Sequence, residues 1–253
     1  MKIINLILLC LILSSCTTTL KYTMNNSKFL TPETKGKFLS GDVGLSYQLT
    51  NKVVLESAFD PLIFNTPIVL DLNYITTGFN LSLPINLGLL ERLDFYSIDS
   101  KYGFKYQFIG DPAIKRTEEY KAAIALGYGV DKPESGNIIY NGSSTRTYNT
   151  SIKIKSYETS ILIGKRVSEK SLLYTNLFYD YYNYNGDLTS SQFSPIHAEG
   201  HSYNAGALFG YELSNKDFPI AIIRLEGGVA VGRLDNTDSK TSGAIGASAS
   251  LGW

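Results

Sequence analysis

The last thirteen residues, TSGAIGASASLGW at positions 241–253, decide the fold of this chain. Alternate positions separate into two sets. One set is mainly apolar and ends on an aromatic side chain: Gly243, Ile245, Ala247, Ala249, Leu251 and Trp253. The other set contains small, weakly polar residues: Ser242, Ala244, Gly246, Ser248, Ser250 and Gly252. Because successive side chains of a strand point to opposite faces, this pattern predicts a β-strand with an apolar environment on one side only.

The same two-residue period recurs upstream, in segments near the roughly 9–11 residues that a tilted membrane-spanning strand requires. With the final strand these segments make eleven: 39–49, 53–59, 75–87, 91–98, 102–108, 120–130, 154–163, 173–181, 203–211 and 221–231. Single-chain bacterial barrels have an even number of strands, so we place a twelfth strand at residues 18–25. Ten strands is the alternative, if residues 91–98 and one neighbouring segment are not separate strands.

A final strand with this alternation and a terminal aromatic resembles the closing strand of Gram-negative outer-membrane β-barrel proteins. The resemblance implies an all-β, closed antiparallel transmembrane up-and-down β-barrel over residues 16–253. It also implies that Leu251 and Trp253 belong to an assembly signal for the barrel assembly machinery. A soluble lipid-anchored sandwich or lipocalin-like barrel is the alternative. Gly, Ser, Ala and Asn dominate the less apolar rows, whereas a soluble exterior carries far more Lys and Glu, which favours the membrane barrel.

The first sixteen residues have the order of a secretory leader. Lys2 supplies a positive charge, and residues 3–13 form an apolar stretch too short to be a stop-transfer helix. Leu13-Ser14-Ser15-Cys16 resembles the lipobox of bacterial lipoproteins, which implies a signal peptide at residues 1–15 and lipid attachment at Cys16. Thr17, in place of Asp, favours sorting to the outer membrane by the lipoprotein sorting machinery.

The connections predict an orientation, because outer-membrane barrels have short periplasmic turns and longer outer loops. Short turns are expected on the periplasmic side at residues 50–52, 88–90, 168–171 and 214–217. The long polar stretches at 131–150 and 184–200 are expected as outer loops and as candidate sites for an extracellular ligand. The strand count then places the lipid-anchored N-terminus on the periplasmic side.

Composition excludes several classes of function. Lys plus Arg equals Asp plus Glu at 23 each, so no basic excess indicates a nucleic-acid partner. Cys10 and Cys16 are the only cysteines, which leaves no disulfide framework and no cysteine-based metal site in the mature domain. We find no nucleotide-binding loop, expect no cofactor, and expect outer-membrane lipids as the surroundings, because 18 Tyr suit membrane interfaces.

The polar rows give the candidate functional residues. Nine polar side chains are predicted to face the lumen: Asp42, Glu56, Lys105, Gln107, Lys121, Asp180, Glu212, Arg224 and Glu226. They fit either a small-solute pore or a structural scaffold whose lumen is filled by balanced charges. Surface recognition through the outer loops is an alternative. An outer-membrane lipid hydrolase acting through His197 or His201 is less favoured, because His201 and Ser202 are neighbours on one predicted strand and point to opposite faces. No enzyme activity is therefore predicted.

Overall fold

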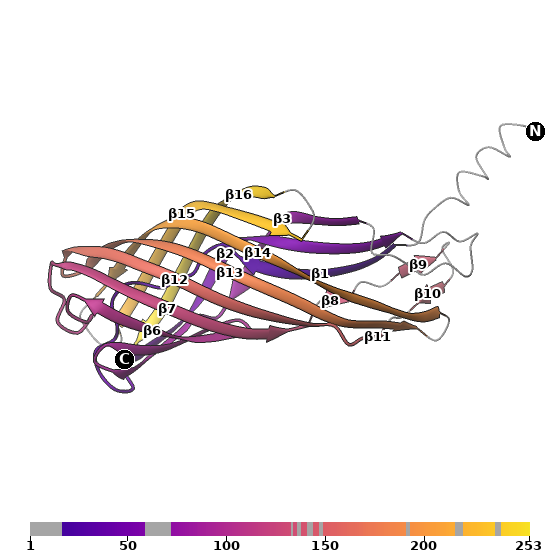
Figure 1. The fold of residues 1–253 in the computed structure, drawn as a ribbon. Coiled ribbons are helices and arrows are strands. Elements are labelled where there is room, and N and C mark those ends of the chain that lie inside the picture. Colours follow the sequence, from indigo (N-terminus) through magenta and orange to yellow (C-terminus); the bar gives the residue numbers. More distant parts are fainter. Residues whose placement is uncertain are drawn as a thin grey trace, which may run out of the picture.

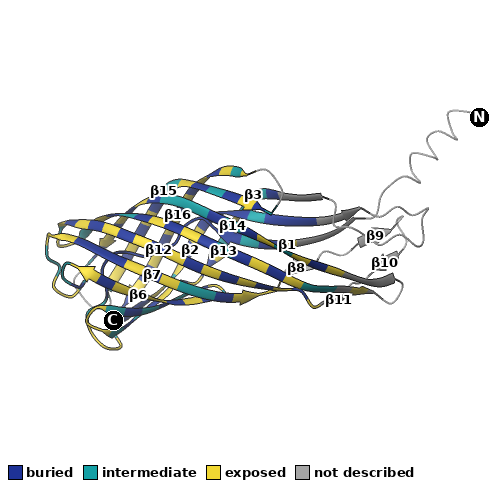
Figure 2. Ribbon diagram, viewed as in Figure 1, coloured by how far each residue is buried: buried dark blue, intermediate teal, exposed yellow. Residues whose placement is uncertain are grey.

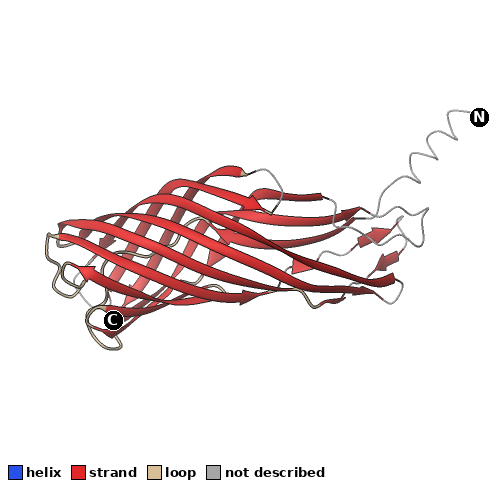
Figure 3. Cartoon of the chain, viewed as in Figure 1, coloured by secondary structure: helices blue, strands red, loops and turns tan. Residues whose placement is uncertain are grey.

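The computed structural model describes most of the mature chain. The described residues are 17–58, 72–132, 134–135, 138–140, 144–146, 149–190, 193–215, 220–235 and 239–253. Cys16 and the predicted leader lie outside them, and so does the side chain of Glu56. Strands are the only regular elements in this part of the chain (Figure 3). Within it, no helix has the length and apolar character needed to cross a membrane.

Ten antiparallel strands form a closed barrel when β3 and β4 are counted as one interrupted strand (Figure 1). Each pairs with the next in this order: β2 (Gly41–Ala58), β3 (Leu72–Ser82) with β4 (Ile85–Leu90), β5 (Leu93–Ile98), β6 (Lys101–Ile109), β7 (Tyr120–Asp131), β12 (Lys153–Ser168), β13 (Ser171–Ser190), β14 (Phe193–Ser214), β15 (Ile220–Leu234) and β16 (Lys240–Gly252). The final strand closes the ring on β2, with Gly252 opposite Asp42. The barrel prediction is confirmed with ten strands, the alternative, and not twelve.

The interruption between β3 and β4 lies at Pro84. Proline has no backbone N–H and cannot donate to a ladder, which accounts for the break at this position. The ladder resumes at once, and Gly44 on β2 donates to the Pro84 carbonyl oxygen at 3.1 Å.

The turn predicted at residues 50–52 is wrong, because β2 continues through it as one strand of 18 residues. Thr50 lies opposite Gly78 of β3 on one side and Asn25 of β1 (Thr17–Asn25) on the other. Pairing along both edges outweighs the turn propensity of a Thr-Asn-Lys sequence that has neither Gly nor Pro. Two predicted strands thus merge into one, which removes the need for a twelfth strand in the ring.

The strand predicted at residues 18–25 exists as β1, but it runs along β2 near one end of the barrel. Thr17 pairs with Ala58 and Asn25 with Thr50, whereas Trp253 lies beside Gly41 at the other end of β2. The first described residue is therefore at the end opposite Trp253. The expectation that the N-terminus lies at the end with the short turns is contradicted by this register.

The end of the barrel that holds Thr17 also holds the long connections. Small strands occupy part of residues 131–150: β8 (Glu134–Ser135), β9 (Ile138–Tyr140), β10 (Ser144–Arg146) and β11 (Asn149–Thr150). Residues 184–200 are not the predicted loop. Most of them continue β13 and β14, with Gly186 opposite Ala198, as a ribbon that extends away from the C-terminal end and is also paired by β11 (Figure 1).

Exposed and buried positions alternate along the wall, as Figure 2 shows by its checkered strands. On β12 every outward residue from Lys153 to Lys165 is exposed and every inward residue between them is buried. In the sequence the apolar alternation shifts by one residue between Ile154 and Tyr157, which predicts a bulge. No bulge forms there, because β12 pairs without a break from Ile154 to Arg166 and Ile154 faces inward. Most large apolar side chains of the predicted rows lie on the exterior, but Val53, Leu55 and Ile75 are buried in an apolar cluster inside the barrel.

Candidate functional site: the filled barrel lumen

The barrel lumen contains the chain's own N-terminal segment, residues 26–37, called here the lumen segment. Asn26 follows β1 halfway down the barrel, and Gly41 is held at the other end by Trp253 through backbone bonds of 3.1 and 3.0 Å. Every residue from Asn26 to Thr34 is buried, without the alternation of a wall strand. The segment therefore passes through the lumen instead of forming part of its wall.

Side chains from the wall accept hydrogen bonds from the backbone of the lumen segment. Glu226 on β15 accepts from the amides of Lys28 at 2.8 Å and Phe29 at 2.9 Å. Gln48 on β2 accepts from the amide of Ser27 at 2.9 Å. Because buried amides without a sheet partner cost free energy if left unpaired, these wall side chains replace the missing ladder. Phe29 has a φ of 51°, in the left-handed region, and the Glu226 carboxylate holds it there.

The same arrangement recurs nearer the short-turn end. Gln107 on β6 accepts from the Thr34 amide at 2.8 Å, and Asp94 on β5 accepts from the Lys35 amide at 3.0 Å. The segment is thus bound by acceptors from four wall strands: β2, β5, β6 and β15.

Ion pairs bind the side chains of the segment at two levels. At the first, Lys28 Nζ lies 2.6 Å from Asp180 Oδ2 and 3.1 Å from Glu158 Oε2. Lys101 Nζ on the wall shares Asp180 at 3.2 Å and donates to the Tyr182 hydroxyl at 2.8 Å. All of these side chains are at most 8% exposed, so water screens the charges poorly.

At the second level, Glu33 is the acceptor for two wall cations. Arg166 donates to both carboxylate oxygens of Glu33, at 2.7 and 2.5 Å, and Lys121 Nζ lies 3.3 Å away. This two-point geometry is the strongest form of an arginine–carboxylate pair. Arg166 also lies 3.5 Å from Glu212, which connects the segment to the next wall cluster.

The wall cluster beside it contains Arg224, which donates to both oxygens of Asp42 at 3.1 Å and to Glu212 at 2.9 Å. Lys35 of the lumen segment pairs with the same Asp42. Lys35 therefore joins the lumen segment to an ion-pair network whose other members lie on the barrel wall.

The lumen charges balance only when the segment is included. The described wall contributes five buried cations, Lys101, Lys105, Lys121, Arg166 and Arg224, and six buried carboxylates, Asp42, Asp94, Glu158, Asp180, Glu212 and Glu226. The segment adds two paired cations and one carboxylate, Lys28, Lys35 and Glu33, whereas its third lysine, Lys37, is exposed. Charges buried from water must be paired, so the wall and the segment are electrostatically complementary.

An apolar cluster fills the lumen between the ion pairs and the end of the barrel that holds Thr17. The Tyr22 hydroxyl and Ser202 Oγ on β14 are 2.7 Å apart, which joins β1 to the far wall. The cluster contains Tyr22, Met24, Val53, Leu55, Ile75, Ile152, Ile154, Tyr182, Tyr184, Ala198 and Leu234. The lumen is thus filled by an ionic layer and by an apolar layer.

Eight of the nine predicted lumen residues are buried inside the barrel: Asp42, Lys105, Gln107, Lys121, Asp180, Glu212, Arg224 and Glu226. The ninth, Glu56, has a side chain outside the described part. Four further wall charges were missed, Asp94, Lys101, Glu158 and Arg166, although the same alternation places them on the inner face. The lumen segment itself had no periodic signal, because its partners come from distant strands.

The two histidines lie on the extended ribbon. His197 Nδ1 is 2.8 Å from Asp187 Oδ1, and this hydrogen bond raises the pKa of His197 above its ordinary value. His201 points outward to Asp235, while Ser202 points inward to Tyr22. His201 and Ser202 therefore do not form the serine–histidine pair of a hydrolase.

Among the described residues, no group of His, Cys, Asp and Glu has the arrangement of a metal site. Of the two predicted assembly residues, Leu251 is exposed on the outer face, and Trp253 Nε1 donates to the Leu39 carbonyl at 2.7 Å across the barrel seam. No protein-family model matches the chain, and no curated protein matches it significantly.

Proposed function

We propose that this protein is a non-conducting outer-membrane β-barrel lipoprotein that acts as a structural scaffold, with its lumen sealed by its own N-terminal segment. The observation that carries the proposal is the ionic and backbone bonding of residues 26–37 to the wall. A permanent small-solute pore is disfavoured, because an open path requires this segment to leave and several buried charges to lose their partners.

A row of tyrosines on the exterior supports a membrane boundary. Five of them lie opposite one another on five neighbouring strands, β6, β7, β12, β13 and β14: Tyr102, Tyr128, Tyr157, Tyr181 and Tyr203. Adjacent rings of the first four are 5.4–6.4 Å apart. Outer-membrane barrels have such aromatic girdles at both interfaces, where the ring contacts lipid and the hydroxyl contacts water.

A second set of aromatics lies toward the other end, with Tyr120, Tyr211 and Trp253 all exposed. From Tyr120 to Tyr128 strand β7 advances by about 26 Å at roughly 3.3 Å per residue. A strand tilt of about 40° reduces this to about 20 Å along the barrel axis, near the roughly 25 Å of an outer-membrane apolar band. Most exposed side chains between the two sets are apolar, such as Ile124, Leu126 and Ile161.

The position of Thr17, at the end of the barrel opposite Trp253, changes the orientation that we propose for the lipid anchor. If the short turns near Trp253 face the periplasm, as in other barrels, then Thr17 lies on the outer side. A lipid on Cys16, one residue earlier, would then enter the outer leaflet, and not the periplasmic side first expected. The β13–β14 ribbon would project from the same surface, where ligand recognition by the outer connections stays a prediction.

Refolded protein in a planar bilayer is the test of this function. We expect no current steps up to high voltage, because the lumen segment and the apolar cluster occupy the interior of the barrel in the described part of the chain. Heat-modifiable migration on a detergent gel shows that the same sample holds a closed barrel. Regular conductance steps from folded, intact protein would contradict a sealed scaffold and support the pore.

A further inference from the structure

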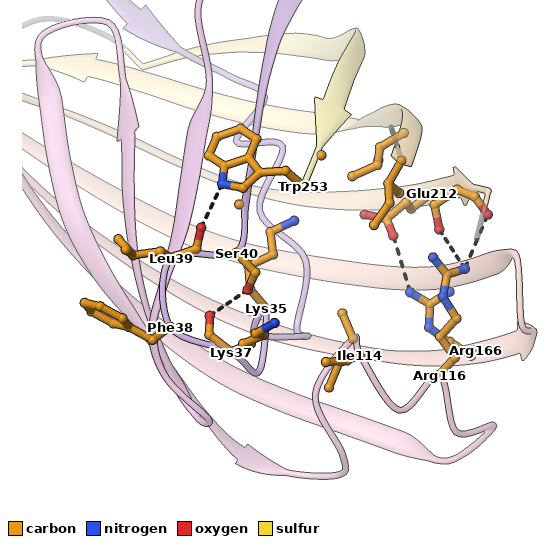
Figure 4. Close-up of a pocket in the computed structure, with 16 residues that line it drawn as sticks. Lys35, Lys37, Phe38, Leu39, Ser40, Ile114, Arg116, Arg166, Glu212 and Trp253 are labelled. Carbon is orange, nitrogen blue, oxygen red and sulfur yellow. Dashed lines mark hydrogen bonds and ion pairs between the residues drawn. The ribbon is translucent and has the colours of Figure 1, made fainter. Parts of the chain in front are cut away.

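A cavity of about 440 Å³ lies at the short-turn end of the barrel, where Lys35, Arg166 and Glu212 of the ion-pair network form part of its lining. Its walls come from the segment leading into β2, the connection between β6 and β7, the ends of β12, β14 and β15, and Trp253. Figure 4 shows Trp253, Leu39 and Phe38 on one side and Arg116, Arg166 and Glu212 on the other. The volume lies within the range of small-molecule sites.

The charge in this cavity is unbalanced. Four cationic side chains line it, Lys35, Lys37, Arg116 and Arg166, against one carboxylate, Glu212. Lys35 and Arg166 are neutralised by Asp42 and Glu33. Within the described part of the chain, neither Lys37 nor Arg116 forms an ion pair with a carboxylate. Two positive charges thus remain available to an anion.

Arg116 is held in place by neutral groups. Its guanidinium donates to the carbonyl oxygens of Glu169 at 2.6 Å and Asn215 at 2.7 Å. Arg166 donates to the same Glu169 oxygen at 3.2 Å, so two guanidinium groups lie side by side. The pKa of Arg116 is below its ordinary value, because burial and the neighbouring Arg166 disfavour the charged form. A bound anion would relieve this cost.

The opposite wall is apolar and continues onto the lipid-facing exterior. Phe38 is 65% exposed, Leu39 54%, Ile114 59% and Trp253 48%, although all four also line the cavity. An occupant can therefore place a charged group in the cavity that Arg116 and Lys37 both line, and an acyl chain along the apolar wall. A free inorganic anion would contact the cationic side chains of this site but not its apolar wall.

We propose that the cavity binds an anionic lipid of the adjacent leaflet, with its phosphate at Arg116 and Lys37 and its acyl chain against Phe38, Leu39 and Trp253. This rests on the proposed membrane location. A lipid bound here would fix the short-turn end of the scaffold at the membrane surface, where the chain leaves the lumen and enters β2.

The chain's single tryptophan, Trp253, lines the site and reports on it directly. Folded full-length protein in zwitterionic micelles is titrated with phosphatidylglycerol that carries brominated acyl chains, and separately with brominated phosphatidylcholine. We expect half-quenching of Trp253 at an about tenfold lower mole fraction of the anionic lipid, the effect of one or two charge-assisted hydrogen bonds.

The Lys37→Gln/Arg116→Gln variant should reduce this preference to within about twofold. Lys165→Gln, which removes an exposed lysine of β12 elsewhere on the barrel, should leave it unchanged. Because Arg116 also holds two turns, Lys37→Gln alone and Arg116→Lys test the site if the double variant misfolds. The first should weaken the preference, and the second should retain it.

Equal quenching by the two lipids, or a preference that survives Lys37→Gln/Arg116→Gln in folded protein, would overturn the proposal. So would loss of the preference when inorganic phosphate is added at the lipid's own concentration, since the anion alone would then suffice. Failure of the proposed function is a different result: protein that stays monodisperse without detergent is no membrane barrel, whatever it binds.

Discussion

Chains that lack residues 17–37 should conduct ions in a planar bilayer, whereas the intact chain should stay silent. An eight-stranded barrel has an interior that side chains fill, and a 16-stranded barrel has an open channel. Ten strands leave room beyond the wall side chains, and the lumen segment occupies that room together with Tyr22 and Met24 of β1. Removing them opens the ionic layer and the apolar layer at once.

The barrel seam should survive this deletion, because it is formed by residues that remain. Leu39 donates to Gly88 at 2.9 Å, and Gly41 and Trp253 exchange two backbone bonds. Each sample is first assigned as folded by heat-modifiable migration, and intact protein at the same concentration is the control. A folded deletion variant that shows no current steps would mean that the wall side chains alone close the lumen.

Asp180→Asn should lower the free energy of unfolding by about 3–5 kcal/mol, the usual cost of breaking a buried ion pair from one side. Asp180 is fully buried and accepts from Lys28, Lys101 and Tyr182. The amide keeps the shape of the carboxylate but leaves two ammonium groups with Glu158 alone. Urea unfolding in lipid vesicles, followed by Trp253 fluorescence, measures the change.

Asp187→Asn is the matched control, on the same strand and with the same change of atoms. Asp187 is half exposed and pairs with His197, so its loss should cost less than about 1 kcal/mol. Adding Lys28→Met to Asp180→Asn should recover part of the loss, because one unpaired charge is then removed. Equal effects of the two asparagine variants would contradict a buried network that binds the lumen segment.

Much of the wall was predictable from alternation alone. Lys105, Lys121 and Arg224 each lie one residue from an exposed apolar or aromatic side chain. Because successive side chains of a strand point to opposite faces, all three face inward. The same alternation places Glu158 and Arg166 on the inner face, although neither was among the nine predicted lumen residues. The barrel and its closing strand followed from the same periodicity.

Turns and the lumen segment were beyond this reasoning for a physical reason. Residues 50–52 have turn-forming side chains, yet pairing with β1 and β3 along both edges keeps them in a strand. Residues 184–200 have a loop composition, yet most of them pair across a ribbon. The lumen segment obeys no local period, because its amides bond to Glu226, Gln107 and other side chains that only the closed barrel assembles.

A disulfide across the lumen tests most directly whether residues 26–37 fill the barrel. In a chain that lacks the leader and carries Cys16→Ser, Ser27→Cys and Gly246→Cys are combined. A Cβ built on Gly246 lies 2.9 Å from Ser27 Cβ, so a small outward shift permits the bond. The control pairs Ser27→Cys with Gly243→Cys, whose added Cβ meets nothing within 4 Å.

We predict that mild oxidation of the folded Ser27→Cys/Gly246→Cys protein joins the two introduced thiols in nearly all molecules, seen as a reducible change of migration on denaturing gels. The Gly243→Cys control should stay reduced, because that position faces the exterior. Failure of the Ser27→Cys/Gly246→Cys pair to close in folded protein, or equal closure in both variants, would contradict a barrel filled by its own N-terminal segment.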